Sequence, residues 1–352
     1  MNAWKVAVLV CVCGVAGLSC ASAKSWAAAK SAPSGPTIVS FDPSGSVRTV
    51  PSAINQSGQV TGSYNDPSDV NHGFLREADG TILSFDPPGS TNTISNGING
   101  SGVMTGSYHD THDYGFIREA NGDFITFDAS SGGSGFGTYP YAISDSGEVA
   151  GGSYDSSHDE HSFLRQSNGT IINFDPPGAE SDTAYGIGPN GQVIGSATIN
   201  GTAYGYIRDQ SGTITTFSAP GSVNGTYPAS INRLGQIAGI YYGRENSSHG
   251  FVRDQFGHFT TFTVSGGVCG ASQYAIVTSI NDAGEVAGYT VTSHNCATAF
   301  LREPDSGVTF FRAPGAGGGF NAGTYAGGLN DSGTVEGFYI DAEGVYHGYV
   351  GY

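Results

Sequence analysis

Acidic and histidine side chains gather in three short polar stretches of the first half of the chain. The candidate metal ligands among them are Asp66, Asp69, His109, Asp110, His112, Asp113, Asp155, His158 and Asp159. Carboxylate oxygens are the ligands that Ca²⁺ takes, whereas imidazole nitrogens favour transition metals. No stretch has the ligand spacing of an EF-hand. Two alternatives stay open: a cation site built from several loops, with Ca²⁺ as the possible ion, or solvated acidic loops.

Tyrosines provide a second set of candidates. A tyrosine combines an apolar ring with a polar hydroxyl, so it can stack on a sugar ring or anchor a protein partner. The alternative is that these rings pack beneath loops. The candidate ligand-binding residues are Tyr139, Tyr185, Tyr227, Tyr274 and Tyr325.

Motifs for catalysis are missing from the sequence. It has no G-x-S-x-G elbow, no H-E-x-x-H zinc motif, no P-loop and no dinucleotide fingerprint. Four histidines and six arginines recur at fixed repeat positions, which favours structural roles. They are His72, His161, His249 and His347, and Arg76, Arg118, Arg165, Arg208, Arg253 and Arg302. We expect the histidines to hydrogen-bond a loop backbone within their own repeat, and the arginines to tie adjacent repeats together or to lie along the rim. We therefore predict no catalytic residue and no organic cofactor.

The elements that must position these side chains form an internal repeat. A pair of glycines, as in Gly58 and Gly62 of "SGQVTG", recurs seven times at steps of 44 to 49 residues. Each repeat holds four short strand-like segments, and its tight turns contain Asn, Asp and Gly. Such a period with only strands inside it predicts radial repetition of a small antiparallel sheet.

Residue size orders the four strands from axis to rim. The first strand of each repeat is rich in small residues, and the third and fourth carry aromatic residues such as Phe74 and Phe85. The chain opens on an isolated fourth strand at residues 37–42 and finishes on a third strand at residues 347–350. We predict an all-β, seven-bladed β-propeller over residues 37–352, with four antiparallel strands per blade. The N-terminal strand would join the last blade and close the ring.

The alternating strand direction also assigns the connections to two faces. The first and third turns of each repeat share one face, and the other two connections, expected to be long, share the other. Cys269 and Cys296 both fall on this long-loop face of the sixth repeat. In an exported chain such a pair predicts a disulfide.

The N-terminus has the pattern of an export signal. Lys5 precedes an apolar run at residues 6–18, and Ala21-Ser22-Ala23 offers a cleavage site. We predict a signal peptide at residues 1–23, cleavage near Ala23, a flexible linker at residues 24–36 and a secreted or periplasmic protein. No later segment is apolar enough to span a membrane. A formal charge of −17 argues against nucleic-acid binding.

Three blocks carry a resemblance to a known family. They are "HGFLRE" from His72, "HSFLRQ" from His161 and "HGFVRD" from His249, and each follows a block of the type "IN…G-x-V-x-G" or its "IS" variant. The chain resembles the extracellular HAF repeat family of bacteria over its whole mature length. It departs from the His-Ala-Phe signature, because Gly or Ser usually replaces Ala and Tyr114, Tyr204 and Thr298 replace His. The resemblance implies secretion and repeats but no chemistry.

The sequence thus favours a secreted, non-catalytic recognition or scaffold module that binds a glycan or a protein through its long-loop face. One alternative is an exported carbohydrate-active enzyme, a polysaccharide lyase or glycosidase, with an axial active site. Another is a purely structural envelope protein.

Overall fold

The structure is a computed structural model that describes residues 36–130, 137–157 and 159–352. The predicted signal peptide and all of the linker except Pro36 lie outside the described residues. None of the helices in these ranges is long and apolar enough to cross a membrane. The described chain is all-β apart from one short 3₁₀ turn, Arg244–Asn246.

Strands follow one another in groups of four, and we call each group a unit. Unit 1 comprises β2 (Arg48–Ile54), β3 (Val60–Asn65), β4 (Asn71–Arg76) and β5 (Ile82–Phe85). Unit 2 comprises β6 (Asn92–Ile98), β7 (Met104–His109), β8 (Asp113–Arg118) and β9 (Phe124–Phe127). Unit 3 comprises β10 (Thr138–Ile143), β11 (Val149–Tyr154), β12 (Glu160–Arg165) and β13 (Ile171–Phe174). Unit 4 comprises β14 (Ser181–Ile187), β15 (Val193–Ile199), β16 (Thr202–Arg208) and β17 (Ile214–Phe217).

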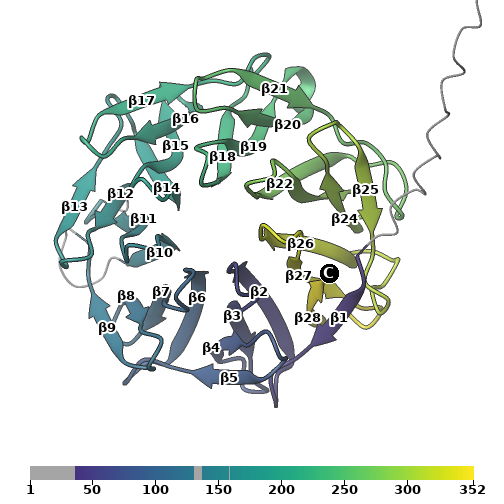
Figure 1. The fold of residues 1–352 in the computed structure, drawn as a ribbon, viewed down its shortest axis with the longest axis horizontal. Coiled ribbons are helices and arrows are strands. Elements are labelled where there is room, and N and C mark those ends of the chain that lie inside the picture. The colour runs from purple at the N-terminus through teal and green to yellow at the C-terminus, as the bar shows by residue number, and fades with distance from the viewer. Residues whose placement is uncertain (1–35, 131–136, 158) are drawn as a thin grey trace, which may run out of the picture. The chain divides into compact units, whose positions relative to one another are not determined.

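The remaining units have the same order of strands. Unit 5 comprises β18 (Thr226–Ile231), β19 (Ile237–Tyr242), β20 (Ser248–Arg253) and β21 (Phe259–Phe262). Unit 6 comprises β22 (Tyr274–Ile280), β23 (Val286–Val291), β24 (Ala297–Arg302) and β25 (Val308–Phe311). Unit 7 comprises β26 (Gly323–Leu329), β27 (Val335–Ile340), β28 (Tyr346–Gly351) and, from the other end of the chain, β1 (Ile38–Phe41). Within residues 36–352 the units lie around a central opening, with the first strand of each unit innermost (Figure 1).

The core lies between neighbouring units and follows the predicted gradient of side-chain size. A Cβ at Gly62 of β3 would lie 2.3 Å from the carbonyl oxygen of Val50 on β2, so only glycine lets these strands approach. Further out, aromatic side chains fill the widening space. The fully buried ones include Phe74, Phe116, Phe163, Tyr206, Phe251, Phe300 and Tyr349.

The sheet topology corrects the predicted architecture. The 28 strands form four four-stranded sheets and one mixed twelve-stranded sheet, and none of these sheets is closed. The prediction of a single seven-bladed propeller, in which each blade is a separate four-stranded sheet, is therefore wrong. Units 6, 7 and 1 are joined by parallel backbone bridges, Ala297 to Gly323 and Arg48 to Tyr346.

Backbone contact between units explains this difference from the prediction. Gly323 has a φ of +118°, and a Cβ there would lie 2.2 Å from the carbonyl oxygen of Ala297. The bare backbone lets β26 bond to the neighbouring unit, where side chains would otherwise keep the strands apart. The second bridge is accompanied by the guanidinium of Arg48 over the ring of Tyr346, 4.4 Å from its centre.

The predicted pairing of the N-terminal strand is confirmed. β1 runs antiparallel to β28, with Ile38 opposite Gly351 and Phe41 opposite Gly348. Phe41 then packs edge-on against Phe74 of unit 1, with ring centres 5.7 Å apart. The two ends of the repeat array are therefore held together by backbone bonds and by a shared aromatic contact.

The recurring arginines also tie units together, as expected. Each lies at the end of a third strand, and its guanidinium covers a phenylalanine from the fourth strand of the preceding unit. The six pairs are Arg76 and Phe41, Arg118 and Phe85, Arg165 and Phe127, Arg208 and Phe174, Arg253 and Phe217, and Arg302 and Phe262, at 4.4 to 5.2 Å. Such pairs add a cation–π contact to the six interfaces that they bridge.

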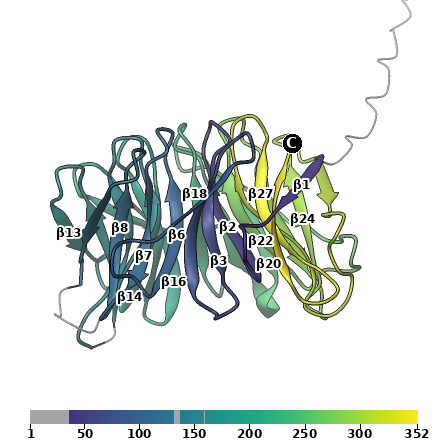
Figure 2. The same cartoon turned by 90° about the horizontal axis from the view of Figure 1, so that it is seen from below.

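The predicted disulfide is confirmed between Cys269 and Cys296, whose Cα atoms are 5.9 Å apart. The side view separates the two loop faces (Figure 2). The expectation that both kinds of connection on the disulfide face are long holds only for those between units. The connection between β15 and β16, for example, consists only of Asn200 and Gly201.

Candidate functional site

An irregularity recurs in every innermost strand and builds the central channel. In the pairing of β2 with β3, the register shifts between Pro51 and Ala53, so Ser52 is an extra residue. A register shift occurs at the same place in all seven units, and in unit 7 it spans both Gly327 and Gly328. A β-bulge of this kind bends a strand and re-aims the side chain at the extra position. The residues at the bulges, which we call the collar, are Ser52, Asn96, Tyr141, Tyr185, Ala229, Thr278 and Gly327.

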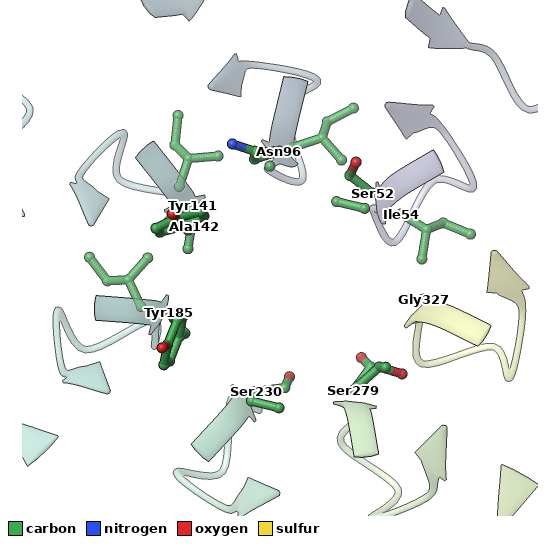
Figure 3. A pocket seen from close by; sticks show the side chains of 18 of the residues that line it. Ser52, Ile54, Asn96, Tyr141, Ala142, Tyr185, Ser230, Ser279 and Gly327 are labelled. Atoms are coloured by element: carbon green, nitrogen blue, oxygen red, sulfur yellow. The ribbon is translucent and has the colours of Figure 1, made fainter. Parts of the chain in front are cut away.

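The collar lines a cavity of about 430 Å³ on the axis, together with the last residues of the innermost strands. Labelled side chains from several units surround the opening in Figure 3. The lining carries hydroxyl, amide, aliphatic and aromatic groups, and among the described residues its only titratable side chains are Tyr141 and Tyr185. The described cavity is therefore neutral, in contrast to the acidic chain as a whole.

Two adjacent tyrosines make one side of the collar aromatic. The rings of Tyr141 and Tyr185 have centres 6.2 Å apart and planes inclined by 51°. Tyr185 is 37% exposed, and its hydroxyl accepts a bond from Ser196 Oγ at 3.4 Å. Burial raises the pKa of the Tyr141 phenol to about 12, so it stays a neutral hydrogen-bond donor near pH 7. The collar residues of the next three units, Ala229, Thr278 and Gly327, are small.

In the part of the chain that the structure describes, charged side chains line the channel at the end bounded by the first turn of each unit. A second cavity there, about 250 Å³, is lined by Asp145, Arg233, Asp282 and Asp331 among others. Arg233 donates from Nε to Asp282 at 2.7 Å and also pairs with Asp331. Asp145 accepts a bond from the backbone N–H of Gly100 at 2.8 Å. These carboxylates bind protein groups, so their role in this structure is to join neighbouring turns.

The structure separates the predicted tyrosines. Tyr185 lies in the collar, whereas the hydroxyl of Tyr139 donates to Asp113 Oδ2 at 2.5 Å. Tyr227 packs edge-on against Tyr242, and Tyr325 stacks on Phe338 with ring centres 4.6 Å apart. Tyr274 lines a separate hollow beside the 3₁₀ turn. Only Tyr185 of these five therefore reaches the axial cavity.

The predicted metal ligands engage local protein groups. Asp66 accepts backbone bonds from Ser68 and Val70, and Asp155 does the same from Ser157 and Asp159. Asp69 accepts from the side chain of Asn65 at 2.9 Å.

The middle stretch forms histidine–carboxylate pairs. Nδ1 of His109 lies 2.8 Å from Asp113, and Nε2 of His112 lies 3.1 Å from Asp128. The backbone N–H of Asp110 donates to the backbone carbonyl of His112. His158 lies outside the described residues. A metal site shared by these loops stays a prediction.

Three of the recurring histidines hold two loops together in their own unit. In unit 1 His72 Nδ1 lies 2.7 Å from Asp86, and its Nε2 lies 3.8 Å from Asp66. In unit 7 His347 lies 2.7 Å from Asp42 and 3.3 Å from Asp341. The third, His161 in unit 3, lies between Asp175 and Asp155. The expected structural role agrees with this geometry, although the partners are carboxylates rather than backbone groups.

Sequence reasoning missed most of the collar and one carboxylate cluster. Ser52, Asn96, Ala229 and Gly327 were not singled out, because a bulge cannot be placed from residue types alone. Within the described part of the chain, one group of three His, Asp, Glu or Cys side chains has mutually close ligand atoms: His161, Asp175 and Asp182. Its available signal was an aspartate in the inner strand of unit 4, where five other repeats have threonine and one has alanine.

No protein-family model and no curated protein sequence matches this chain. Solved structures do resemble it. A streptogramin B lyase has a TM-score of 0.58 and 11% identity, over 90% of this chain and 98% of that one. A virginiamycin B lyase from Staphylococcus aureus has a TM-score of 0.56 and 12% identity, over 90% and 99% of the two chains. A puromycin hydrolase has a TM-score of 0.56 and 13% identity, over 86% of this chain and 52% of that one.

These likenesses show a β-propeller-like fold. At such identities they show the fold alone, since one fold hosts many unrelated activities. The function must be argued from the site.

Proposed function

We propose that this protein is an exported, non-catalytic recognition module that binds a neutral glycan segment in its axial channel. The observation that carries the proposal is the collar: five of its seven residues carry phenol, hydroxyl or amide groups, and they line one neutral cavity. Sugars present hydroxyl groups at their edges and C–H groups on their faces. The collar offers matching hydrogen-bonding groups and aromatic rings.

Export is supported by the signal-like N-terminus and by the disulfide, because disulfides persist in oxidising compartments. The resemblance to the extracellular HAF repeat family points the same way. The glycan is preferred over a folded protein as ligand, because a cavity of about 430 Å³ accommodates a small segment rather than a protein surface.

We place the proposed binding site in the channel, and at the channel end that the first turn of each unit bounds, rather than on the long-loop face. Both axial cavities are lined by the ends of the inner strands or by the turns that follow them. The alternative, an axial glycosidase or lyase site, needs a pair of acid and base groups at the reacting atoms. The collar supplies only tyrosines, and the carboxylates near Arg233 are held by protein donors.

A glycan array followed by calorimetry on the best binder tests the proposal. Tyr185→Ala is expected to weaken binding by at least tenfold, because it removes the exposed wall of the collar. Tyr274→Ala is the matched control, since Tyr274 lies outside the channel, and it is expected to bind like the wild type. Equal binding by Tyr185→Ala, or loss confined to Tyr274→Ala, would contradict a channel site. Turnover of the bound glycan would contradict the non-catalytic role.

A further inference from the structure

Asp182 breaks the repeat at a buried position. It is the second residue of β14 and lies opposite Ala197 of β15. The register places Thr49, Thr93, Thr138, Thr226 and Thr324 at the same position in five other units, and Ala275 in the sixth. Unit 4 alone has a carboxylate there.

Threonine at this position has a structural partner in the other units. Thr49 Oγ1 donates to Asp42 at 2.6 Å, and Thr138 Oγ1 donates to Asp128 at 3.0 Å. Both acceptors are aspartates that follow the outermost strand of the neighbouring unit. In unit 4 the corresponding aspartate is Asp175. An ionised Asp182 has no proton to donate to it, so the usual hydrogen bond is replaced by two facing carboxyl groups.

A histidine completes the group. His161 Nδ1 lies 2.8 Å from Asp175 Oδ1, and single ligand atoms of His161, Asp175 and Asp182 all lie within 4.8 Å of one another. His161 Nε2 lies 3.5 Å from Asp155 Oδ2. Asp155 is itself held by the backbone N–H groups of Ser157 and Asp159. Three carboxylates and one imidazole therefore meet at the interface of units 3 and 4.

The buried oxygen of Asp182 is the second, independent observation. The residue is only 3% exposed. Its Oδ1 accepts a bond from the Ser162 backbone N–H at 3.1 Å, but its Oδ2 is buried without a hydrogen-bond partner. The nearby Ser162 hydroxyl is bonded to the hydroxyl of Tyr206 at 2.7 Å. A buried carboxylate oxygen without a donor is costly unless a cation or proton compensates it.

We propose that His161, Asp175 and Asp182 bind a divalent transition-metal ion of the Zn²⁺ or Mn²⁺ class. One imidazole with two carboxylates suits these ions, whereas Ca²⁺ takes six to eight oxygen ligands. Asp155 has the position of the outer carboxylate that orients a ligating histidine through its second nitrogen. Binding would replace the contact between His161 and Asp175 by bonds to a shared ion.

Units 1 and 7 provide a natural comparison. His72 with Asp86 and Asp66, and His347 with Asp42 and Asp341, repeat the histidine and its two carboxylates. At the position of Asp182 they have Thr93 and Thr49. The cation site is therefore expected in unit 4 only, and this inference does not depend on the channel function.

Calorimetry and native mass spectrometry on the full mature chain, first stripped with EDTA, test the site with Zn²⁺, Mn²⁺ and Ca²⁺ separately. We expect one equivalent of Zn²⁺ or Mn²⁺ to bind, with Ca²⁺ at least tenfold weaker. Asp182→Thr restores the residue of the other repeats, so it is expected to fold and to bind at least tenfold more weakly. His72→Ala, in the comparison unit, is expected to leave the stoichiometry and affinity unchanged.

Thermal unfolding supplies a readout that does not rely on the titration. Added Zn²⁺ is expected to raise the Tm of the wild type and of His72→Ala but not that of Asp182→Thr. Absence of Zn²⁺ and Mn²⁺ binding by the wild type would overturn the proposal, and the two carboxyl groups would then be sharing a proton. Equal binding by Asp182→Thr would also overturn it, because the ion would then sit elsewhere.

Discussion

The side-chain amide of Asn330 donates to the backbone carbonyl of Asn55, 3.2 Å away and 275 residues distant in the chain. The same bond links successive units elsewhere, from Asn55 to Asn99, Asn99 to Ser144, Asn232 to Asn281 and Asn281 to Asn330, at 2.8 to 3.1 Å. In five of the seven units the residue after the inner strand is an asparagine, and its side chain bonds the turn of the next unit. The bond from Asn330 extends this series across the junction between the last and first units.

Replacing Asn330 tests what this junction contributes. The side chain is 2% exposed, and its Oδ1 also accepts the backbone N–H groups of Ser332 and Thr334. Asn330→Ala removes all these bonds and is expected to lower the free energy of unfolding by about 2 to 3 kcal/mol. Denaturant unfolding followed by fluorescence measures the change.

Asn330→Ser distinguishes the bond to Asn55 from the bonds within the turn that Asn330 begins. Serine stands at the equivalent position 144, where its Oγ accepts the backbone N–H of Glu148 at 3.1 Å. The serine variant keeps the turn but lacks the donor to Asn55, so its loss is expected to be about 1 kcal/mol. A serine variant as stable as the wild type would show that the contact between the chain ends contributes nothing.

Glu336 gives the stability of the protein a predictable pH dependence. It is fully buried on β27; its Oε1 accepts the backbone N–H of Gly328 at 2.5 Å, and its Oε2 has no partner. Burial raises the pKa of Glu336 from 4.5 to about 8. Between these values the folded protein holds a proton that the unfolded chain has lost. Stability is therefore expected to fall as pH rises through this window, by about 1.4 kcal/mol per pH unit.

Glu336→Gln removes this ionisation at nearly constant volume and keeps an acceptor for Gly328. We expect the variant to be more stable than the wild type at pH 8 and the difference to shrink towards pH 5. Chemical denaturation at several pH values measures the two slopes. A difference between the two proteins that does not vary with pH would refute the assignment.

The side chain of Phe41 is expected to hold β1 in its pairing with β28. Its ring packs on Phe74, lies under Arg76 and fits over Gly348, where a Cβ would approach within 2.8 Å. Phe41→Ala is expected to cost about 2 to 3 kcal/mol and to speed amide hydrogen exchange in residues 37–42. Phe217→Ala is the matched control, since Phe217 is the equally half-buried partner of Arg253 inside the array. Similar exchange of residues 37–42 in both variants would contradict the special role of Phe41.

The disulfide is expected to stabilise unit 6 and its link to unit 7. Cys296 is buried next to Ala297, which forms the bridge to Gly323. Replacing Cys269 and Cys296 together by alanine is expected to lower the free energy of unfolding by roughly 3 kcal/mol. Alkylation of the denatured mature protein without reductant, read by mass spectrometry, is expected to modify neither cysteine. Full modification would contradict the pairing.

Repetition made much of this structure predictable. The glycines at Gly58 and Gly62, and their recurrences, predicted the order of strands because tight turns and close strand pairs leave few alternatives to glycine. The pairing of β1 with β28 followed from counting strand types at the two ends. The disulfide followed from the alternation of strand direction. All three depend on local backbone geometry or on topology, which a repeat displays directly.

Side-chain convergence across units was not predictable in the same way. The bridge at Gly323 depends on how closely two units approach, and it produced the twelve-stranded sheet where a separate one was expected. The bulges that direct Tyr141 and Tyr185 into the channel are single-residue shifts of register, which leave the pattern of residue types unchanged.

The sequence by itself determined the units, their strand order and the joining of the two ends, because these follow from turns and hydrophobic patterning within about 44 residues. Only the tertiary structure decided which side chains share a cavity or a cluster. Tyr185 at the axis and Asp182 beside His161 owe their places to contacts between units, where distance in space is not encoded by distance along the chain.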